Sequence, residues 1–156
     1  MNMLTHDMAK IADRAGLNPF ESCLLISTLH NLNDTFQKHM NDVMVINRLA
    51  DLDQFKDARF DKIIIMASGI SMDSVLQYLD KLSYMAASGL EHGPVIYVHG
   101  IKDANPKRDD RRLRKMSEGN ARKSPKNNNT EFYKWRFFSL FKEPWEDNYN
   151  LLVMPS

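Results

Sequence analysis

The stretch Phe60-Asp61-Lys62-Ile63-Ile64-Ile65-Met66-Ala67 contains the longest apolar run of the chain, over residues 63–67. Its β-branched isoleucines favour a buried strand. A run this short has no periodicity that separates a buried strand from a buried helix, so both assignments stay open. Residues 68–71, Ser-Gly-Ile-Ser, then predict a turn, and Ser71 is placed to cap a helix that runs through residues 75–85 and ends at Gly89.

Three further segments downstream have the composition of strands. Residues 95–98, Val-Ile-Tyr-Val, are β-branched and aromatic, residues 131–141 have strong strand propensity, and residues 149–154 predict a shorter last strand. The strands at 95–100 and 132–141 flank a basic segment of the chain. We therefore expect these two strands to pair as a hairpin, with the basic segment as its extended loop.

The N-terminal part of the chain predicts helices. Thr5 is placed to cap a short helix that Gly16 ends, and residues 18–21, Asn-Pro-Phe-Glu, have the pattern of a second helix start. A long amphipathic helix from about residue 19 to the high 40s is predicted by apolar residues that recur on one side: Leu25, Leu29, Leu32, Phe36, Met40 and Val43. Such a helix would pack on a second copy of the chain, as a homo-oligomer, unless its apolar stripe belongs to the core.

Together these elements predict an α+β fold. N-terminal helices, one of them long and amphipathic, would pack on a small, mainly antiparallel sheet with a long basic loop between two strands. A chain of 156 residues, 43% hydrophobic and 26% charged, fits a single domain over residues 1–156 that buries a core. With six glycines and six prolines, the composition is not that of a disordered or collagenous chain.

The basic segment, residues 102–130, is called the basic arm below. From residue 102 to 126 it holds ten basic and four acidic residues, a net charge of +6, whereas the rest of the chain has 11 basic and 16 acidic residues, a net charge of −5. Such an asymmetry produces a field that attracts polyanions. The arm is rich in polar residues and has little to bury, so we expect it to be mobile until it meets a partner.

Two patterns in and beside the arm are typical of nucleic-acid binding. Arg108, Arg111, Arg112 and Lys115 would line one face of a helical turn, and Asp110 and Arg114 would form a favourable i, i+4 pair. Directly after the arm, residues 132–138 alternate aromatic and cationic side chains. Alternation along a strand places Tyr133, Trp135 and Phe137 on one face, where they would stack on bases while neighbouring cations contact phosphates.

These patterns lead to the hypothesis of a non-enzymatic nucleic-acid-binding protein, more suited to single-stranded DNA or RNA than to a duplex. It would have little sequence specificity and act as an accessory to replication or transcription. The predicted nucleic-acid-binding residues are Lys107, Arg108, Arg111, Arg112, Arg114, Lys115, Arg122, Lys123, Lys126, Tyr133, Lys134, Trp135 and Arg136. The alternative, in which the aromatic residues belong to the core and the arm is only a solvated loop, stays open.

Two other functions remain as alternatives. The protein would be a structural or assembly component if its basic arm docks on an acidic partner. It would be a small hydrolase or a phosphate-ligand enzyme if residues 61–67 and 94–100 were parallel strands and Ser71 and His99, at their carboxyl ends, formed a nucleophile–base pair. In that case the 68–71 turn would direct backbone N–H groups towards an anion. If the two residues have no catalytic role, Ser71 only caps a helix and His99 only lies at the end of a strand.

No cofactor and no metal are predicted. His30 and His39 are nine residues apart, so on one helix they would point to opposite faces, and His92 and His99 have no cysteine or carboxylate at ligand spacing. The single cysteine, Cys23, cannot form an internal disulfide, which favours a reducing, cytoplasmic setting. The N-terminal residues lack the pattern of a secretory signal and the 63–67 run is too short to cross a bilayer, so no membrane partner is expected.

Overall fold

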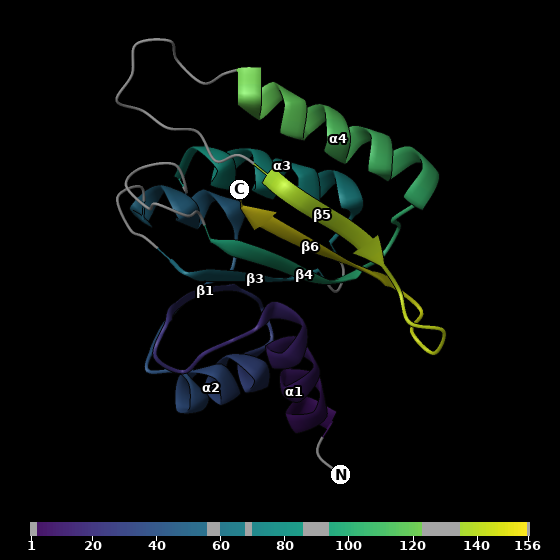
Figure 1. Cartoon of the computed structure of the whole chain (residues 1–156). Coiled ribbons are helices and arrows are strands. Elements are labelled where there is room, and N and C mark those ends of the chain that lie inside the picture. The colour runs from purple at the N-terminus through teal and green to yellow at the C-terminus, as the bar shows by residue number, and fades with distance from the viewer. Residues whose placement is uncertain (1–2, 56–59, 68–69, 86–93, 123–134, 156) are drawn as a thin grey trace.

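A six-stranded mixed sheet organises the computed structural model, which describes residues 3–55, 60–67, 70–85, 94–122 and 135–155 (Figure 1). The strand order is β2-β1-β3-β4-β6-β5. β1, β2, β3 and β4 are mutually parallel, and β6 is antiparallel to both of its neighbours. The strands are β1 (Ser22–Ile26), β2 (Asp42–Ile46), β3 (Lys62–Met66), β4 (Val95–Ile101), β5 (Trp135–Phe141) and β6 (Tyr149–Pro155).

Helices cover both faces of the sheet. α1 (Met3–Ala15) and α2 (His30–His39) lie on one face, and α3 (Met72–Met85) and α4 (Pro106–Arg122) lie on the other (Figure 1). A 3₁₀ helix, η1 (Leu49–Phe55), lies on the connection from β2 to β3. Within the described part of the chain, no helix is long and apolar enough to cross a membrane.

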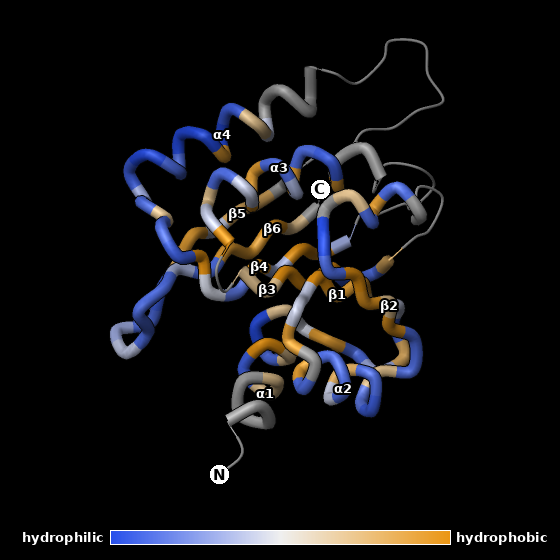
Figure 2. The backbone as a smooth tube through the Cα atoms, turned by 180° about the vertical axis from the view of Figure 1, so that it is seen from behind, coloured by the Kyte–Doolittle hydropathy of each residue, from blue (hydrophilic) through white to orange (hydrophobic). Residues whose placement is uncertain are grey.

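The 60–67 stretch contains β3, a strand that is buried on both faces. Ile63 and Ile65 of β3 join the core beneath α3, whereas Ile64 and Met66 join the core beneath α1 and α2. Because successive side chains point to opposite faces and both faces are covered, every position favours an apolar residue. Figure 2 shows the result, with β1, β3 and β4 mainly in the hydrophobic colour and α2 and α4 mainly in the hydrophilic one.

The predicted long amphipathic helix is wrong. The residues from 19 to the high 40s form β1, α2 and β2 in succession. Residues 23–26 are fully buried in the sheet, and their continuous apolar run matches one side of a helix as well as a two-sided strand. The supposed helix start at Asn18 is a turn, since the N–H of Phe20 donates to Asn18 Oδ1 (3.0 Å) and that of Glu21 to Asn18 O (3.0 Å).

The prediction of a small, mainly antiparallel sheet with a 95–100/132–141 hairpin is also wrong. β6 lies between β4 and β5 and pairs with both, so the two predicted partners are not neighbours. Three of the five strand pairs are parallel. The strand composition of each segment was read correctly, but composition does not specify which strand pairs with which.

The long basic loop between two strands is replaced, over residues 106–122, by α4. The N–H groups of Lys107 and Arg108 donate to Asn105 Oδ1 (3.1 and 3.4 Å), and the N–H of Asn105 donates to Asp109 Oδ2 (2.6 Å). With Pro106 at its first position, this is a well-capped helix start. α4 packs against α3 and β5. Residues 123–130 of the arm lie outside the described residues.

Asp109 holds the first turns of α4 together. Its carboxylate is fully buried and accepts hydrogen bonds from Arg108 Nε (2.9 Å) and Arg112 Nη1 (3.1 Å). Arg112 also pairs with Asp73 of α3, and so joins the two helices. Burial alone would raise the pKa of Asp109, but the hydrogen bonds from Arg108, the Asn105 N–H and Arg112 outweigh it and lower that pKa.

We predict that Asp109→Asn lowers the free energy of unfolding by about 1.5–3 kcal/mol, because charge-assisted hydrogen bonds at a buried carboxylate are lost. The matched control is Asp110→Asn, which removes an exposed i, i+4 pair with Arg114 (2.9 Å) and should cost about 0.5 kcal/mol or less. Urea unfolding with an unchanged m-value measures both. Equal losses for the two variants would contradict the assigned role of Asp109.

Candidate functional site

The carboxyl ends of the parallel strands converge at one edge of the sheet. The chain leaves β1 through α2 on one face and leaves β3 through α3 on the other face (Figure 1). β1 and β3 are neighbours, so the strand order reverses between them. Crevices for ligands in open α/β sheets form outside the carboxyl ends of the strands at such a reversal.

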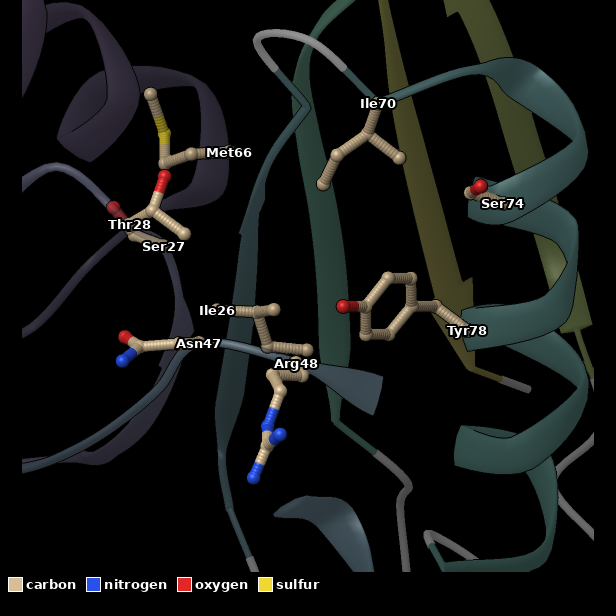
Figure 3. Close-up of a pocket in the computed structure, with 9 residues that line it drawn as sticks. All are labelled: Ile26, Ser27, Thr28, Asn47, Arg48, Met66, Ile70, Ser74 and Tyr78. Carbon is tan, nitrogen blue, oxygen red and sulfur yellow. The ribbon is translucent and has the colours of Figure 1, made fainter. Parts of the chain in front are cut away.

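A pocket of about 370 Å³ lies at this point (Figure 3). Its polar lining comes from three connections, Ser27 and Thr28 after β1, Asn47 and Arg48 after β2, and Ser74 on α3. The apolar part consists of Ile26, Met66, Ile70 and Tyr78. Figure 3 shows the Tyr78 ring extending from α3 towards Ile26, with its hydroxyl oxygen leading. The volume and the mixed lining are those of a small-molecule site.

The loop after β1 is fixed by its own hydrogen bonds. The Ser27 N–H donates to Ile46 O at the end of β2 (2.9 Å), and Ser27 Oγ accepts from the N–H of Leu29 (3.0 Å). The side chain of Asn33 on α2 donates to Ser27 O (3.5 Å), while its Oδ1 is buried and has no partner among the described residues. Ser27 itself is 2% exposed, so its position in the pocket wall is set by the fold.

Arg48 is the only charged residue among the nine that line the pocket. Its side chain is 76% exposed and lies 3.5 Å from Asp51, three residues on, at the long end of the range for an ion pair. A long ion pair with so exposed an arginine contributes little to stability. The pocket therefore offers a positive charge beside hydroxyl and amide groups, which suits a ligand with an anionic group.

A second polar cluster lies at the same edge, at the end of β4. Arg14 of α1 donates to both carboxylate oxygens of Glu146 (2.8 and 3.1 Å) and to the Tyr97 hydroxyl (3.1 Å), which in turn lies 2.8 Å from His99 Nδ1. Asn150 donates to Glu146 and accepts from the Gly100 N–H (3.1 Å). The cluster thus joins α1, β4 and the connection between β5 and β6.

Burial and pairing shift the pKa values of this cluster. The Arg14 guanidinium lowers the pKa of Glu146 to about 2, with further help from Glu143 N–H and Asn150. Burial raises the pKa of Tyr97 to about 12, although the hydrogen bond from Arg14 opposes that change. Burial acts to lower the pKa of Arg14, but Glu146 and Tyr97 outweigh it and the pKa is raised. At neutral pH the cluster therefore holds a carboxylate, a guanidinium and a neutral phenol.

The structure does not bring Ser71 and His99 together as a nucleophile–base pair. Ser71 Oγ accepts from the N–H of Ser74 (3.2 Å) as a cap of α3, on one face of the sheet, whereas His99 points with Tyr97 to the opposite face. The N-terminal end of α3 is also not available to an anion, because the Met72 N–H already donates to an Asp103 carboxylate oxygen (2.6 Å). The predicted hydrolase or phosphate-ligand enzyme using Ser71 and His99 is wrong.

The predicted nucleic-acid-binding residues fall into three groups. Exposed positions of α4 hold Lys107, Arg108, Arg111, Arg114 and Lys115, with Arg112 half-buried between Asp73 and Asp109 and Arg122 as the last residue of the helix. Trp135 and Arg136 begin β5. Outside the described residues lie Lys123, Lys126, Tyr133 and Lys134.

No family model and no curated protein matches the chain. Among solved structures, it is similar to a precorrin-6y C5,15-methyltransferase from Geobacter metallireducens, with 12% identity, a TM-score of 0.44 and coverage of 95% of this chain and 86% of that one. It is also similar to a precorrin 8w decarboxylase from Methanobacterium thermoautotrophicum, with 9% identity, a TM-score of 0.46 and coverage of 97% and 89%.

The predicted function is corrected on these findings. The described part of the basic arm is a capped helix packed on α3, in which Arg108, Arg112 and Arg114 pair with the protein's own carboxylates. The premise of a mobile arm that awaits a polyanion or an acidic partner is thereby lost, and the long helix predicted to form a homo-oligomer does not exist. The non-enzymatic interpretation rested on these two premises and loses its basis with them.

Sequence reasoning missed the residues of the pocket. Ser27 and Thr28 follow one apolar run, and Asn47 and Arg48 follow another, so a polar pair after a short apolar run is the pattern that the sequence offers. The pattern indicates a site only if both runs are strands, and together they also match one side of a single helix. The Arg14–Glu146 pair, 132 residues apart in the chain, has no pattern in the sequence that would find it.

We predict that the free energy of unfolding falls as the pH drops from about 5 towards 2, in part through Glu146. Because the folded-state pKa of about 2 lies below the ordinary value of 4.5, its contribution of about 3 kcal/mol is present above that value and is lost as the pH approaches 2. Glu146→Gln should flatten this part of the stability profile. Glu143→Gln, in the same connection, is the control, and an equal change for both variants would contradict the assignment.

Proposed function

We propose that the protein is a small-molecule enzyme that binds an anionic substrate or cofactor in the pocket at the carboxyl ends of β1, β2 and β3. The observation that carries the proposal is the position of this pocket, at the reversal of strand order where open α/β sheets bind their ligands. The cytoplasmic setting expected from the single cysteine, Cys23, is part of the proposal. The buried thiol itself, with a pKa raised by burial to about 12, has no part in the chemistry.

The charge of the lining supports an anionic ligand. Arg48 supplies a guanidinium that can donate two parallel hydrogen bonds to a phosphate or carboxylate, and none of the nine lining residues is acidic. Arg48 follows β2 by two residues and Ser27 by 21. In dinucleotide-binding doubly wound folds, the residue that contacts the ribose lies about 20 positions past the first loop, and an arginine near that position accommodates a ribose 2′-phosphate.

The rest of the lining suits the body of such a ligand. Thr28 and Asn47 are exposed at the mouth and offer hydroxyl and amide groups to sugar or base hydroxyls. Ile26, Met66 and Tyr78 are buried and offer an apolar wall to a flat ring. The loop after β1 lacks the glycines that let a pyrophosphate approach the backbone, so a nucleoside monophosphate is a better probe than a dinucleotide.

We expect the protein to bind adenosine or uridine 5′-monophosphate more tightly than the uncharged nucleosides, as measured by isothermal titration calorimetry. Arg48→Gln should weaken monophosphate binding about 10- to 100-fold, because a charge-assisted hydrogen bond contributes about 1.5–3 kcal/mol. Nucleoside binding should change little.

The matched control is Arg111→Gln on α4, which removes the same exposed charge at a distance from the pocket. It should leave binding unchanged at fixed ionic strength. If both variants lose affinity equally, the attraction is a general charge effect and the pocket assignment is wrong. If no monophosphate binds more tightly than its nucleoside, the anionic ligand class is wrong.

A further inference from the structure

Three neutral polar side chains form one wall of the pocket, which we call the polar wall. It consists of Ser27, Thr28 and Asn47, from the connections after β1 and β2. The last residues of these two strands, Ile26 and Ile46, pair in register, and the N–H of Ser27 donates to Ile46 O (2.9 Å). The two connections therefore begin side by side. Figure 3 shows the polar wall on one side of Ile26 and the α3 part of the lining on the other.

The protein itself leaves hydrogen-bonding groups of the polar wall unused. Ser27 Oγ accepts from the Leu29 N–H (3.0 Å), but its own O–H has no acceptor among the described residues, although the side chain is buried. The Thr28 hydroxyl and the Asn47 carboxamide likewise make no hydrogen bond to the described part of the chain. A buried hydroxyl without an acceptor is unfavourable, so a ligand that supplies one in this pocket is stabilised by the contact.

The chemistry of the polar wall matches ligand hydroxyl groups better than an anion. Each of its two hydroxyls can donate once and accept twice, and the Asn47 carboxamide donates from Nδ2 and accepts at Oδ1. Ligand hydroxyls have the same double character, whereas a phosphate or carboxylate only accepts and would leave Asn47 Oδ1 unmatched. Arg48, the next residue in the chain, supplies the charge that an anionic group requires. Hydroxyl groups and an anionic group of one ligand therefore fit neighbouring parts of the lining.

We propose that the polar wall binds the adjacent hydroxyl groups of a sugar, while Arg48 binds a phosphate of the same molecule. The inference rests on the proposed function, because it requires an anionic ligand in this pocket, and it narrows the ligand class to phosphorylated sugars. The sugar phosphate is either free or part of a ribonucleotide, since both present the same hydroxyl and phosphate groups. A pocket of about 370 Å³ suits a molecule of this size.

The first test compares uridine 5′-monophosphate with 2′-deoxyuridine 5′-monophosphate by isothermal titration calorimetry on the full-length protein. We expect the ribonucleotide to bind about 5- to 30-fold more tightly, because its 2′-hydroxyl makes hydrogen bonds to the polar wall that the deoxy compound cannot make. Asn47→Ala should lower this ratio towards one. Asn148→Ala, which removes an exposed asparagine of the β5–β6 connection, should leave it unchanged. Equal affinities for the two nucleotides in the native protein would overturn the inference.

Two variants of Thr28 separate its hydroxyl from its shape. Thr28→Val keeps the shape and removes the hydroxyl, so it should lower the ratio of the two affinities. Thr28→Ser keeps the hydroxyl and should preserve that ratio. A role in packing alone predicts the reverse, with the ratio preserved in Thr28→Val and changed in Thr28→Ser, and would remove Thr28 from the proposed contact.

Ribose 5-phosphate and inorganic phosphate distinguish the two sources of the sugar. If ribose 5-phosphate binds as tightly as uridine 5′-monophosphate, the ligand is a free sugar phosphate, and if it binds more weakly, the ligand is a ribonucleotide. Inorganic phosphate that binds as tightly as both would overturn the sugar contact. If the two nucleotides bind equally but more tightly than uridine, the sugar contact is wrong and the proposed function stands. If no monophosphate binds more tightly than its nucleoside, both are wrong.

Discussion

Parallel pairing of β1 with both β2 and β3 is the constraint on which the rest of the structure depends. Parallel neighbours cannot be joined by a tight turn, so each connection has to return across a face of the sheet. The returning helices bury both faces, which is why β1 and β3 are apolar at successive positions. The same geometry brings the residues after β1 and β2, some 20 positions apart, into one pocket at the carboxyl edge.

The elements that sequence reasoning found are those with a local cause. The cap at Ser71, the β-branched run at 95–98 and the last strand depend on neighbours in the chain, and each is present in the structure. The long helix failed because a strand buried on both faces has no two-residue period, so Leu25 matched a helical stripe by coincidence. Strand pairing failed because the insertion of β6 beside β4 is decided by packing of segments some 50 residues apart.

The site was less predictable than the fold. The position of His99 near the carboxyl end of a parallel strand follows from the strand composition of its segment, and in the structure His99 pairs in register with Met66. Its hydrogen-bond partner Tyr97 was two residues away in the sequence, but the role of that contact depends on Arg14, which comes from α1. The basic arm was misjudged because its composition is that of a solvated loop, whereas its helix is fixed by a few positions, the buried Asp109 and Leu113 above all.

The distribution of the protein's own carboxylates decides where an external anion can bind. Asp103 accepts from the first N–H of α3, Asp109 from two arginines of α4, and Glu146 from Arg14. In each of these places a carboxylate of the protein already pairs with the positive group. An external anion would therefore have to displace a well-placed partner. Arg48 differs, because its contact with Asp51 is long and its own side chain is exposed to solvent, so releasing that contact costs little. Net charge along the sequence pointed to α4, where three of the arginines already pair with carboxylates of the protein, whereas Arg48 lies in a pocket whose lining contains no acidic residue.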